Sequence, residues 1–341
     1  MMCVTPVAAK YFQFPITDSH SSAQLSNEIA PVWMNYSGAA PIVPQFSKIE
    51  MGFHLPLVVE SAVEQFLKTG KGLNPFDPEA INVEVVYTNG NLSYTSYGFY
   101  YEEFERDAAT IVPVFDNCPQ AKWRKASTLY KWRARFAPPV QGVWTAVVNV
   151  YLGDVTSVAY SSAPIRFQCI KEMSSKGFLE VGADKRHFRY SGTKESFFAL
   201  GQDIAWPDGE RFRGGANAVY PNLLAGGYMD VQDWTQNLAQ NGGNMIRVVN
   251  VPWSYELEWD TVGVYNMAHA WELDSLFAVC ESNRVQMVFC LEHGTYSLPS
   301  WYEEHLTWAK HPYHKYIPGV EMPEDFLTDS VARKQYRKKL H

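Results

Sequence analysis

Two different patterns of apolar and polar positions follow one another along the chain. Between residues 46 and 170 apolar residues alternate with polar ones, most clearly at 81–87 and 143–152, and 163–170 is a further β-rich run. This period of two predicts strands with one buried face. Residues 1–45 are rich in Ser, Pro and Ala and have no period, so we predict a leader or linker there.

The alternating region predicts a β-sandwich. Its strands are short, turn residues such as those at 88–91 separate them, and a length of about 120 residues suits an antiparallel sandwich of the immunoglobulin type. The Cys…Trp…Cys spacing of antibody domains is absent. We therefore expect residues 46–170 to form an Ig-like antiparallel β-sandwich.

After residue 170 the apolar runs become nearly continuous. Strands are predicted at 197–201, 245–251 and 285–291, and helices at 230–241 and 269–283. A further helix is expected to begin near Thr328 or Asp329, which is a suitable N-cap. Strands of this kind alternating with helices predict a parallel sheet covered by helices. No Gly-x-Gly-x-x-Gly turn follows the first strand, so a nucleotide-binding fold is not favoured.

Long aromatic loops follow each of these strands, and loops of this kind at the carboxyl ends of strands build the sites of (β/α)8 barrels. A typical barrel needs about 250 residues, and three strands are too few to close one. We therefore predict that residues 171–341 form an incomplete (β/α)8 TIM barrel. The chain as a whole is then expected to be a two-domain β and α/β protein that is cut short after the third barrel strand.

Composition narrows the classes of partner. The net charge is −7, and the basic residues are scattered until the last ten positions, which argues against nucleic acid as the main partner. No apolar run is long enough to span a membrane. The chain holds 11 Trp and 20 Tyr, whose flat faces suit sugar rings but also build cores and interfaces.

Neither a metal nor a cofactor is predicted. The five cysteines are odd in number and lack Cys-x-x-Cys spacing, so they do not indicate a disulfide framework. His305, His311 and His314 fit no standard zinc spacing. The basic run at 333–339 has helical spacing and predicts a solvated helix face.

Three segments after residue 170 resemble the first three barrel strands of clan A glycoside hydrolases of the cellulase and mannanase type: 200–206, 242–253 and 288–294. Within the first of them, Gln202-Asp203 departs from the commoner residues. Residues 46–170 resemble an Ig-like domain of unknown function that often precedes such barrels in bacterial proteins. That likeness is carried by five segments in order, which are 48–53, 74–78, 98–101, 132–138 and 142–144.

The resemblance implies the N-terminal portion of an enzyme that hydrolyses β-linked polysaccharide. Members of the family use a retaining mechanism with two glutamates, one after strand four and one at the end of strand seven. Neither strand is present here, so the catalytic pair is expected to be absent from the chain, which predicts an inactive fragment. An extracellular, periplasmic or cell-surface location is also implied, although the N-terminus shows no signal peptide.

The same resemblance assigns sugar binding to four residues. Arg247 would support the nucleophile, His293 would hydrogen-bond sugar hydroxyls, and Trp206 and Trp253 would stack on sugar rings. Each also has a plainer interpretation, because Arg247 could pair with a core carboxylate, His293 could be a structural histidine, and the tryptophans could pack their loops.

Two further carboxylates flank the same edge of the predicted sheet. Asp203 and Glu292 could form a paired-carboxylate site, although solvated carboxylates are the simpler interpretation. At the level of function, a non-catalytic carbohydrate-binding or cell-surface interaction protein stays open as an alternative, and so does a purely structural sandwich.

Overall fold

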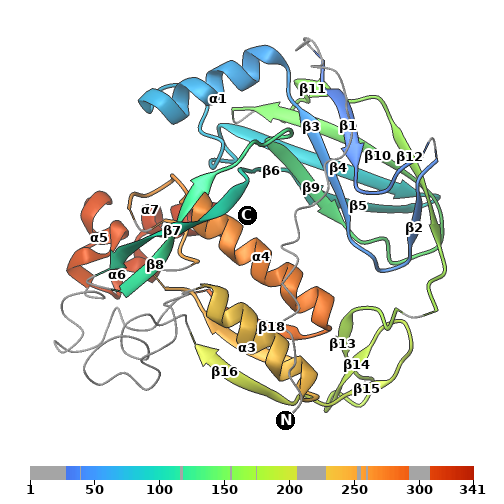
Figure 1. Ribbon diagram of the computed structural model, residues 1–341. Coiled ribbons are helices and arrows are strands. Elements are labelled where there is room, and N and C mark those ends of the chain that lie inside the picture. The colour runs from blue at the N-terminus through green and yellow to red at the C-terminus, as the bar shows by residue number, and fades with distance from the viewer. Residues whose placement is uncertain are drawn as a thin grey trace.

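The structure, a computed structural model, describes most of the chain. The residues that it describes are 28–38, 40–115, 118–153, 156–173, 175–205, 228–251, 255–258, 260–291 and 308–341. Figure 1 shows two large facing sheets, a smaller parallel sheet with two helices, and a group of helices close to the C-terminus. Most of the strands belong to antiparallel pairs.

The two large sheets form a sandwich. One sheet contains, in spatial order, β1 (Ala30–Met34), β3 (Ile49–His54), β9 (Trp132–Phe136) and β6 (Phe99–Tyr100). The other contains β2 (Ile42–Pro44), β12 (Ile165–Ile170), β10 (Gly142–Leu152), β4 (Ile81–Asn89) and β5 (Leu92–Tyr97), with β11 (Tyr160–Ser161) paired to β10. Side chains from both sheets meet in one hydrophobic core.

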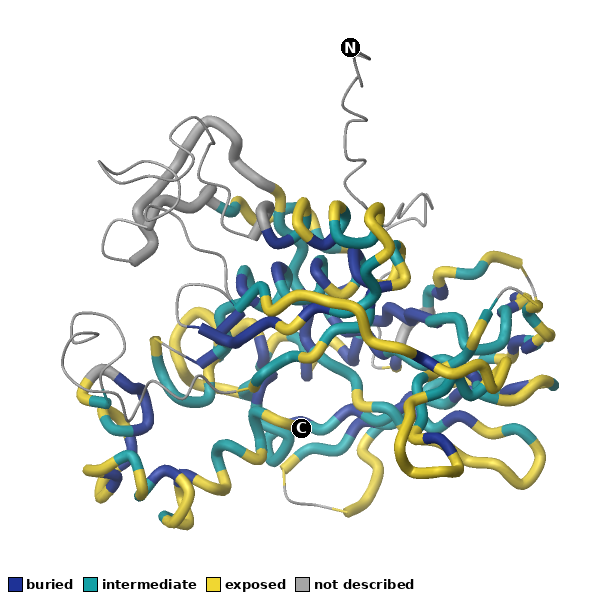
Figure 2. Tube along the Cα trace, turned by 90° about the horizontal axis from the view of Figure 1, so that it is seen from below, coloured by how far each residue is buried: buried dark blue, intermediate teal, exposed yellow. Residues whose placement is uncertain are grey.

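Alternation along the central strands explains this core. Val83 and Val85 of β4 lie opposite Val150 and Val148 of β10, and all four side chains are buried on the inner face. The intervening residues are only partly buried, as the period of two predicts. Figure 2 shows the same change from buried to exposed positions within single strands. The strands predicted at 81–87, 143–152 and 163–170 are confirmed as β4, β10 and β12.

Three elements of this half have no counterpart in the sequence pattern. The short strands β1 and β2 come from residues before 45, where the sequence shows no period, and they pair with β3 and β12. Helix α1 (Leu57–Thr69) follows β3 and buries Val59 and Val63. Short strands carry too few residues to show a period, so long-range pairing alone reveals them.

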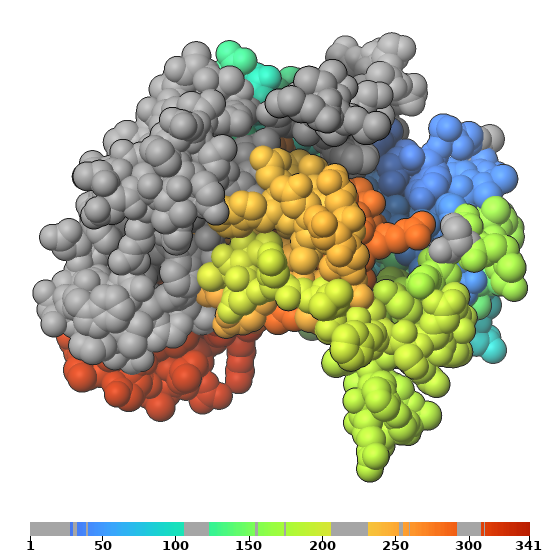
Figure 3. Space-filling model, turned by 60° about the horizontal axis from the view of Figure 1, so that its bottom comes forward, coloured from blue at the N-terminus to red at the C-terminus, as the bar shows by residue number. Residues whose placement is uncertain are grey.

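Two further antiparallel units lie outside the sandwich, a hairpin between β6 and β9 in the chain and a small sheet after β12. A long hairpin consists of β7 (Phe104–Phe115) and β8 (Cys118–Lys125). A small sheet consists of β13 (Leu179–Val181), β14 (Phe188–Tyr190) and β15 (Ser196–Phe197), and it projects from the body of the molecule (Figure 3). The buried strand predicted at 197–201 is therefore wrong, because Phe197 ends β15 and Phe198 is 83% exposed.

The parallel sheet contains β16 (Gly201–Ala205), β17 (Met245–Val249) and β18 (Gln286–Cys290) in chain order. Helices α3 (Tyr228–Gln240) and α4 (Met267–Asn283) cover one face. Their core holds Val231, Ile246, Val248, Leu276 and Cys280. The strands predicted near 245 and 285 and both helices between strands are thus confirmed.

The predicted incomplete (β/α)8 TIM barrel is wrong. In the part of the chain that the structure describes, β16 and β18 each have one strand partner, the sheet stays open, and β-sheets dominate the molecule. The later helices α5 (Pro312–Tyr316), α6 (Asp325–Thr328) and α7 (Ser330–Leu340) form a cluster of their own around Tyr313 and Phe326. The local strand–helix pattern is the same in open and closed parallel sheets, and closure depends on contacts between distant residues.

Helix α4 joins the two halves of the molecule. Its outer side carries Asp274 and Glu281, which form ion pairs with Arg135 of β9 and Lys48 beside β3. Its inner side packs Leu276 against the parallel sheet. Among the described residues, none of the helices is both long enough and apolar enough to cross a membrane.

Candidate functional site

The open face of the parallel sheet presents a pair of opposite charges. Asp203 of β16 lies opposite Arg247 of β17 in the strand register, so both side chains project from the same face. Nη1 of Arg247 donates a hydrogen bond of 2.7 Å to Oδ2 of Asp203, and the two side chains are 48% and 55% exposed. The hydrogen bond to Asp203 raises the pKa of Arg247, and Cys290 adds to this.

The strand period explains why this pair faces solvent. Ile246 and Val248 point into the core beneath α3 and α4, so Arg247 between them points the other way. Val288 of β18 lies opposite Arg247 and is also exposed. A guanidinium, a carboxylate and an apolar side chain thus lie together on one open surface.

Of the four residues that the resemblance assigns to sugar binding, the structure describes Arg247. Arg247 forms the ion pair that the plainer interpretation expects, but its partner Asp203 is exposed and not part of a core, and the sugar-binding assignment of Arg247 stays a prediction. His293, Trp206 and Trp253 lie outside the described residues, and their assignment stays a prediction. Glu292, considered above as a partner of Asp203, lies outside them as well.

Two buried glutamates follow β17, and the sequence analysis did not identify them. Glu256 accepts hydrogen bonds from Nδ2 of Asn250 at 2.6 Å and from the backbone N–H of Glu258 at 3.1 Å. Nζ of Lys339, in α7, lies 2.7 Å from Oε1, the same carboxylate oxygen that accepts from Glu258 N–H. Glu256 is therefore an ion-paired carboxylate that ties the loop after β17 to α7.

Glu258 lies in the same cluster and is 1% exposed. It accepts hydrogen bonds from Gly263 N–H at 2.6 Å, from Nε2 of Gln335 at 2.8 Å and from Tyr313 Oη at 2.9 Å. Burial raises the pKa of Glu258, and these donors oppose the rise. Because both carboxylates are committed to internal donors, we interpret this cluster as structural. The Glu256-Leu-Glu258 spacing is visible in the sequence, but its partners in α5 and α7 are too far away in the chain to be inferred.

The basic run at 333–339 also has internal partners. Lys334 and Lys338 form ion pairs of 2.8 to 2.9 Å with Asp77 and Glu79, which precede β4. The predicted solvated helix face is therefore wrong for Lys338, which is 15% exposed, whereas Lys334 is 62% exposed as predicted although it pairs with Glu79. The predicted N-cap of α7 is confirmed, since Asp329 accepts from two backbone N–H groups.

The histidines near α5 have structural contacts. Nδ1 of His311 accepts from Tyr313 N–H at the start of α5, and Nδ1 of His314 lies 2.9 Å from the carbonyl of Val320. His305 lies outside the described residues. In the ranges that the structure describes, no group of three His, Cys, Asp or Glu residues is placed to hold a metal ion.

Comparison with known proteins gives a distant likeness to a solved structure. No family model and no curated protein sequence matches the chain. Among solved structures, a crystal structure of a "putative glycoside hydrolase" from Bacteroides vulgatus ATCC 8482 is similar over 75% of this chain, with 16% sequence identity and a TM-score of 0.47. The chain covers 42% of the length of that protein.

Proposed function

We propose that this chain is part of a polysaccharide-degrading glycoside hydrolase and supplies some of its sugar-binding surface. The observation that carries the proposal is the exposed Arg247–Asp203 pair on the open face of the parallel sheet. Arg247 lies within the segment 242–253, and Asp203 within 200–206, so both belong to segments that resemble clan A glycoside hydrolases. The sequence pattern thus supports Arg247, whereas Asp203 stands where the first segment departs from the commoner residues, and it is the ion pair that brings Asp203 beside Arg247.

The chemistry of this surface suits a polyhydroxylated ring. A guanidinium donates several hydrogen bonds in one plane, and a carboxylate accepts them, so neighbouring hydroxyls of one sugar can bind both groups. Val288 beside them offers an apolar contact for the C–H face of the ring. In the proposal, His293 adds a hydrogen bond, Trp206 and Trp253 add stacking, and the ligand is an extracellular, periplasmic or cell-surface polysaccharide.

The proposal assigns no catalytic carboxylate to the chain. Asp203 is paired with Arg247, and Glu256 and Glu258 are buried among internal donors. A general acid needs a carboxyl group within reach of the glycosidic oxygen. We therefore expect binding without turnover, with hydrolysis of O-glycosyl bonds assigned to the larger enzyme. The internal hydrogen bonds of Glu256 and Glu258 also agree with the second candidate function, a carbohydrate-binding protein without any hydrolytic role.

A binding assay with matched arginine variants tests the proposal. We expect the chain to be retained on insoluble β-glucan or β-mannan and Arg247→Ala to weaken retention about ten-fold, as the loss of a charged hydrogen-bonding group does. Arg189→Ala is the control, because Arg189 also lies on a strand and forms a 2.7 Å ion pair, with Glu180, on the projecting sheet. Equal loss in both variants, or no retention of the unaltered chain, contradicts the proposal.

The same preparations serve a turnover assay on aryl β-glycosides and on the polysaccharide. We expect no more release of product than from a heat-treated sample. Turnover that Arg247→Ala abolishes would show that this chain holds a catalytic centre of its own, and the assignment of binding without catalysis would then be wrong.

A further inference from the structure

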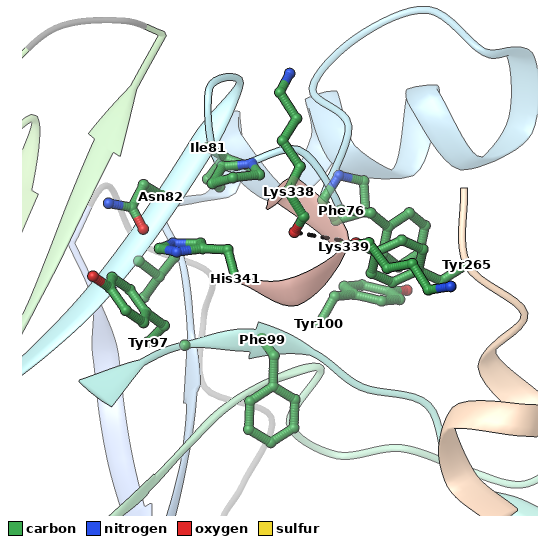
Figure 4. Close-up of a pocket in the computed structure, with 14 residues that line it drawn as sticks. Phe76, Ile81, Asn82, Tyr97, Phe99, Tyr100, Tyr265, Lys338, Lys339 and His341 are labelled. Carbon is green, nitrogen blue, oxygen red and sulfur yellow. Dashed lines mark hydrogen bonds between the residues drawn. The ribbon is translucent and has the colours of Figure 1, made fainter. Parts of the chain in front are cut away.

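A hollow lies where α7 meets the sandwich, and none of its lining residues belongs to the parallel sheet. It has a volume of about 180 Å³ and lies between the start of β4, the strands β5 and β6, Tyr265 and the end of α7 (Figure 4). All of its lining residues belong to the described part of the chain. None of them is among the residues assigned to sugar binding above.

Aromatic rings form two walls of this hollow. On one side the imidazole of His341 lies against Tyr97, with ring centroids 3.9 Å apart. On the other side Phe76 stacks on Tyr265 at 4.8 Å and meets the edge of Tyr100 at 6.0 Å. Figure 4 shows the two groups on either side of the space. A ring that enters this space would meet aromatic surface in its walls.

The charges at the hollow are compensated. Nζ of Lys338 lies 2.8 Å from Asp77 and 2.9 Å from Glu79, and Nζ of Lys339 lies 2.7 Å from Glu256. Each of these cations therefore has a carboxylate partner within the molecule. A charged ligand would lose its hydration without gaining an unpaired opposite charge in the hollow, and this desolvation costs free energy. The lining therefore favours an uncharged ligand.

Polar groups are nevertheless present around the aromatic walls. Tyr265 donates a hydrogen bond of 3.4 Å to the backbone carbonyl of Lys338, and the amide of Asn82 lies at the opposite side. Burial raises the pKa of Tyr100 and of Tyr265, so both phenols stay neutral. Tyr100 donates its proton to Glu102 at 3.3 Å and Tyr265 donates to Lys338, which leaves the lone pairs of both hydroxyls as acceptors. An uncharged ring that carries hydroxyls matches aromatic faces and polar edges together.

The size of the hollow limits the ligand to one ring. Sites for drug-sized molecules are usually about 300–1,000 Å³, and this hollow is smaller at about 180 Å³. We propose that the hollow between Tyr97 and Tyr265 binds a single uncharged sugar ring, as a second carbohydrate site separate from Arg247. This site does not depend on the function proposed for the open face of the parallel sheet.

Ligand-detected NMR with small glycosides tests the proposal on the full chain. The probes are methyl β-D-glucopyranoside and methyl β-D-mannopyranoside, with methyl β-D-glucuronide as the charged comparison and indole as an aromatic ring without hydroxyls. We expect saturable binding of at least one neutral glycoside and weaker binding of the glucuronide. Saturable binding of indole alone, tighter binding of the glucuronide, or no saturation by either neutral glycoside overturns the proposal.

Variants locate the binding. Tyr97→Ala removes one wall at a largely exposed position on the edge strand β5 and should weaken binding about five-fold or more, whereas Tyr97→Phe keeps the ring and should bind as before. Tyr94→Ala, on the same strand but outside the hollow, is the matched control and should leave binding unchanged. If Tyr94→Ala weakens binding as much as Tyr97→Ala does, or if Tyr97→Ala binds normally, the hollow is not the site.

Discussion

The side chain of His311 is 3% exposed and packs between aromatic rings. Its imidazole stacks on Trp308 with ring centroids 4.8 Å apart and meets Phe326 at 5.6 Å. Burial lowers the pKa of His311 to about 3, with smaller contributions from the charges of Lys339 and His314. The imidazole is therefore neutral in the folded protein, which leaves Nδ1 available to accept from Tyr313 N–H.

A pH dependence of stability follows from this burial. Between about pH 6.5 and 3 the unfolded chain binds a proton at His311 and the folded chain does not, so the stability present above pH 6.5 is lost on acidification. The loss is at most about 1.4 kcal/mol per pH unit for one group. We predict that His311→Asn, which keeps an N-cap acceptor but cannot titrate, flattens this dependence in urea unfolding measured between about pH 7 and 5. Parallel pH profiles for the two proteins contradict the prediction.

Helix α4 begins at the N-cap residue Asn266, a residue type that stabilises helix N-termini. The side chain of Asn266 accepts hydrogen bonds from the backbone N–H groups of Ala268 at 3.1 Å and His269 at 3.2 Å. Both donors lack an acceptor within the helix. Because α4 packs on the parallel sheet and also pairs with the sandwich, fraying at this end weakens contacts in both halves.

Replacing the cap tests its contribution. We predict that Asn266→Ala lowers the free energy of unfolding by about 1 kcal/mol, and that Asn266→Asp, which keeps the acceptor, changes it by less than about half of that. Chemical denaturation followed by far-UV circular dichroism measures both. If Asn266→Asp lowers the free energy of unfolding as much as Asn266→Ala does, the side-chain amide, rather than the cap oxygen, stabilises this helix end.

At the scale of the whole molecule, a buried network of charges joins the sandwich to α4. Glu50 is fully buried and accepts from Arg133 Nη1 at 2.9 Å and from Arg135 Nε at 2.7 Å. The other end of the Arg135 guanidinium donates to both carboxylate oxygens of Asp274 in α4. Trp123 of the long hairpin donates to Glu272 of the same helix. Removing one member of such a network leaves a buried charge without its partner.

Arg135→Leu should therefore destabilise the protein strongly. We predict a loss of about 3 kcal/mol in the free energy of unfolding, because Glu50 and Asp274 both lose a partner. Urea denaturation followed by tryptophan fluorescence is the measurement. Arg124→Leu is the control, since Arg124 and Glu105 form an exposed ion pair of 2.8 Å that is worth about 1 kcal/mol or less. Similar losses in the two variants would show that the network does not hold the halves together.

The candidate site was only partly visible in the sequence. Arg247 stood out because a charged residue interrupts an apolar strand, and the structure gives it an exposed position. Its pairing with Asp203 depends on the register between β16 and β17, which the residues of neither strand specify alone. The hollow beside Tyr97 was not predicted at all, since its walls come from residues as far apart as Phe76 and His341.

Local periodicity determined the elements that the sequence alone predicts correctly. The alternation in β4 and β10 and the apolar stripe of α3 are properties of neighbouring residues, so they can be recognised without knowledge of the rest of the chain. Tertiary structure decided the rest. The pairing of β1 and β2 with the sandwich strands, and the contact of Lys338 in α7 with Asp77 and Glu79 instead of water, depend on contacts between residues far apart in the chain.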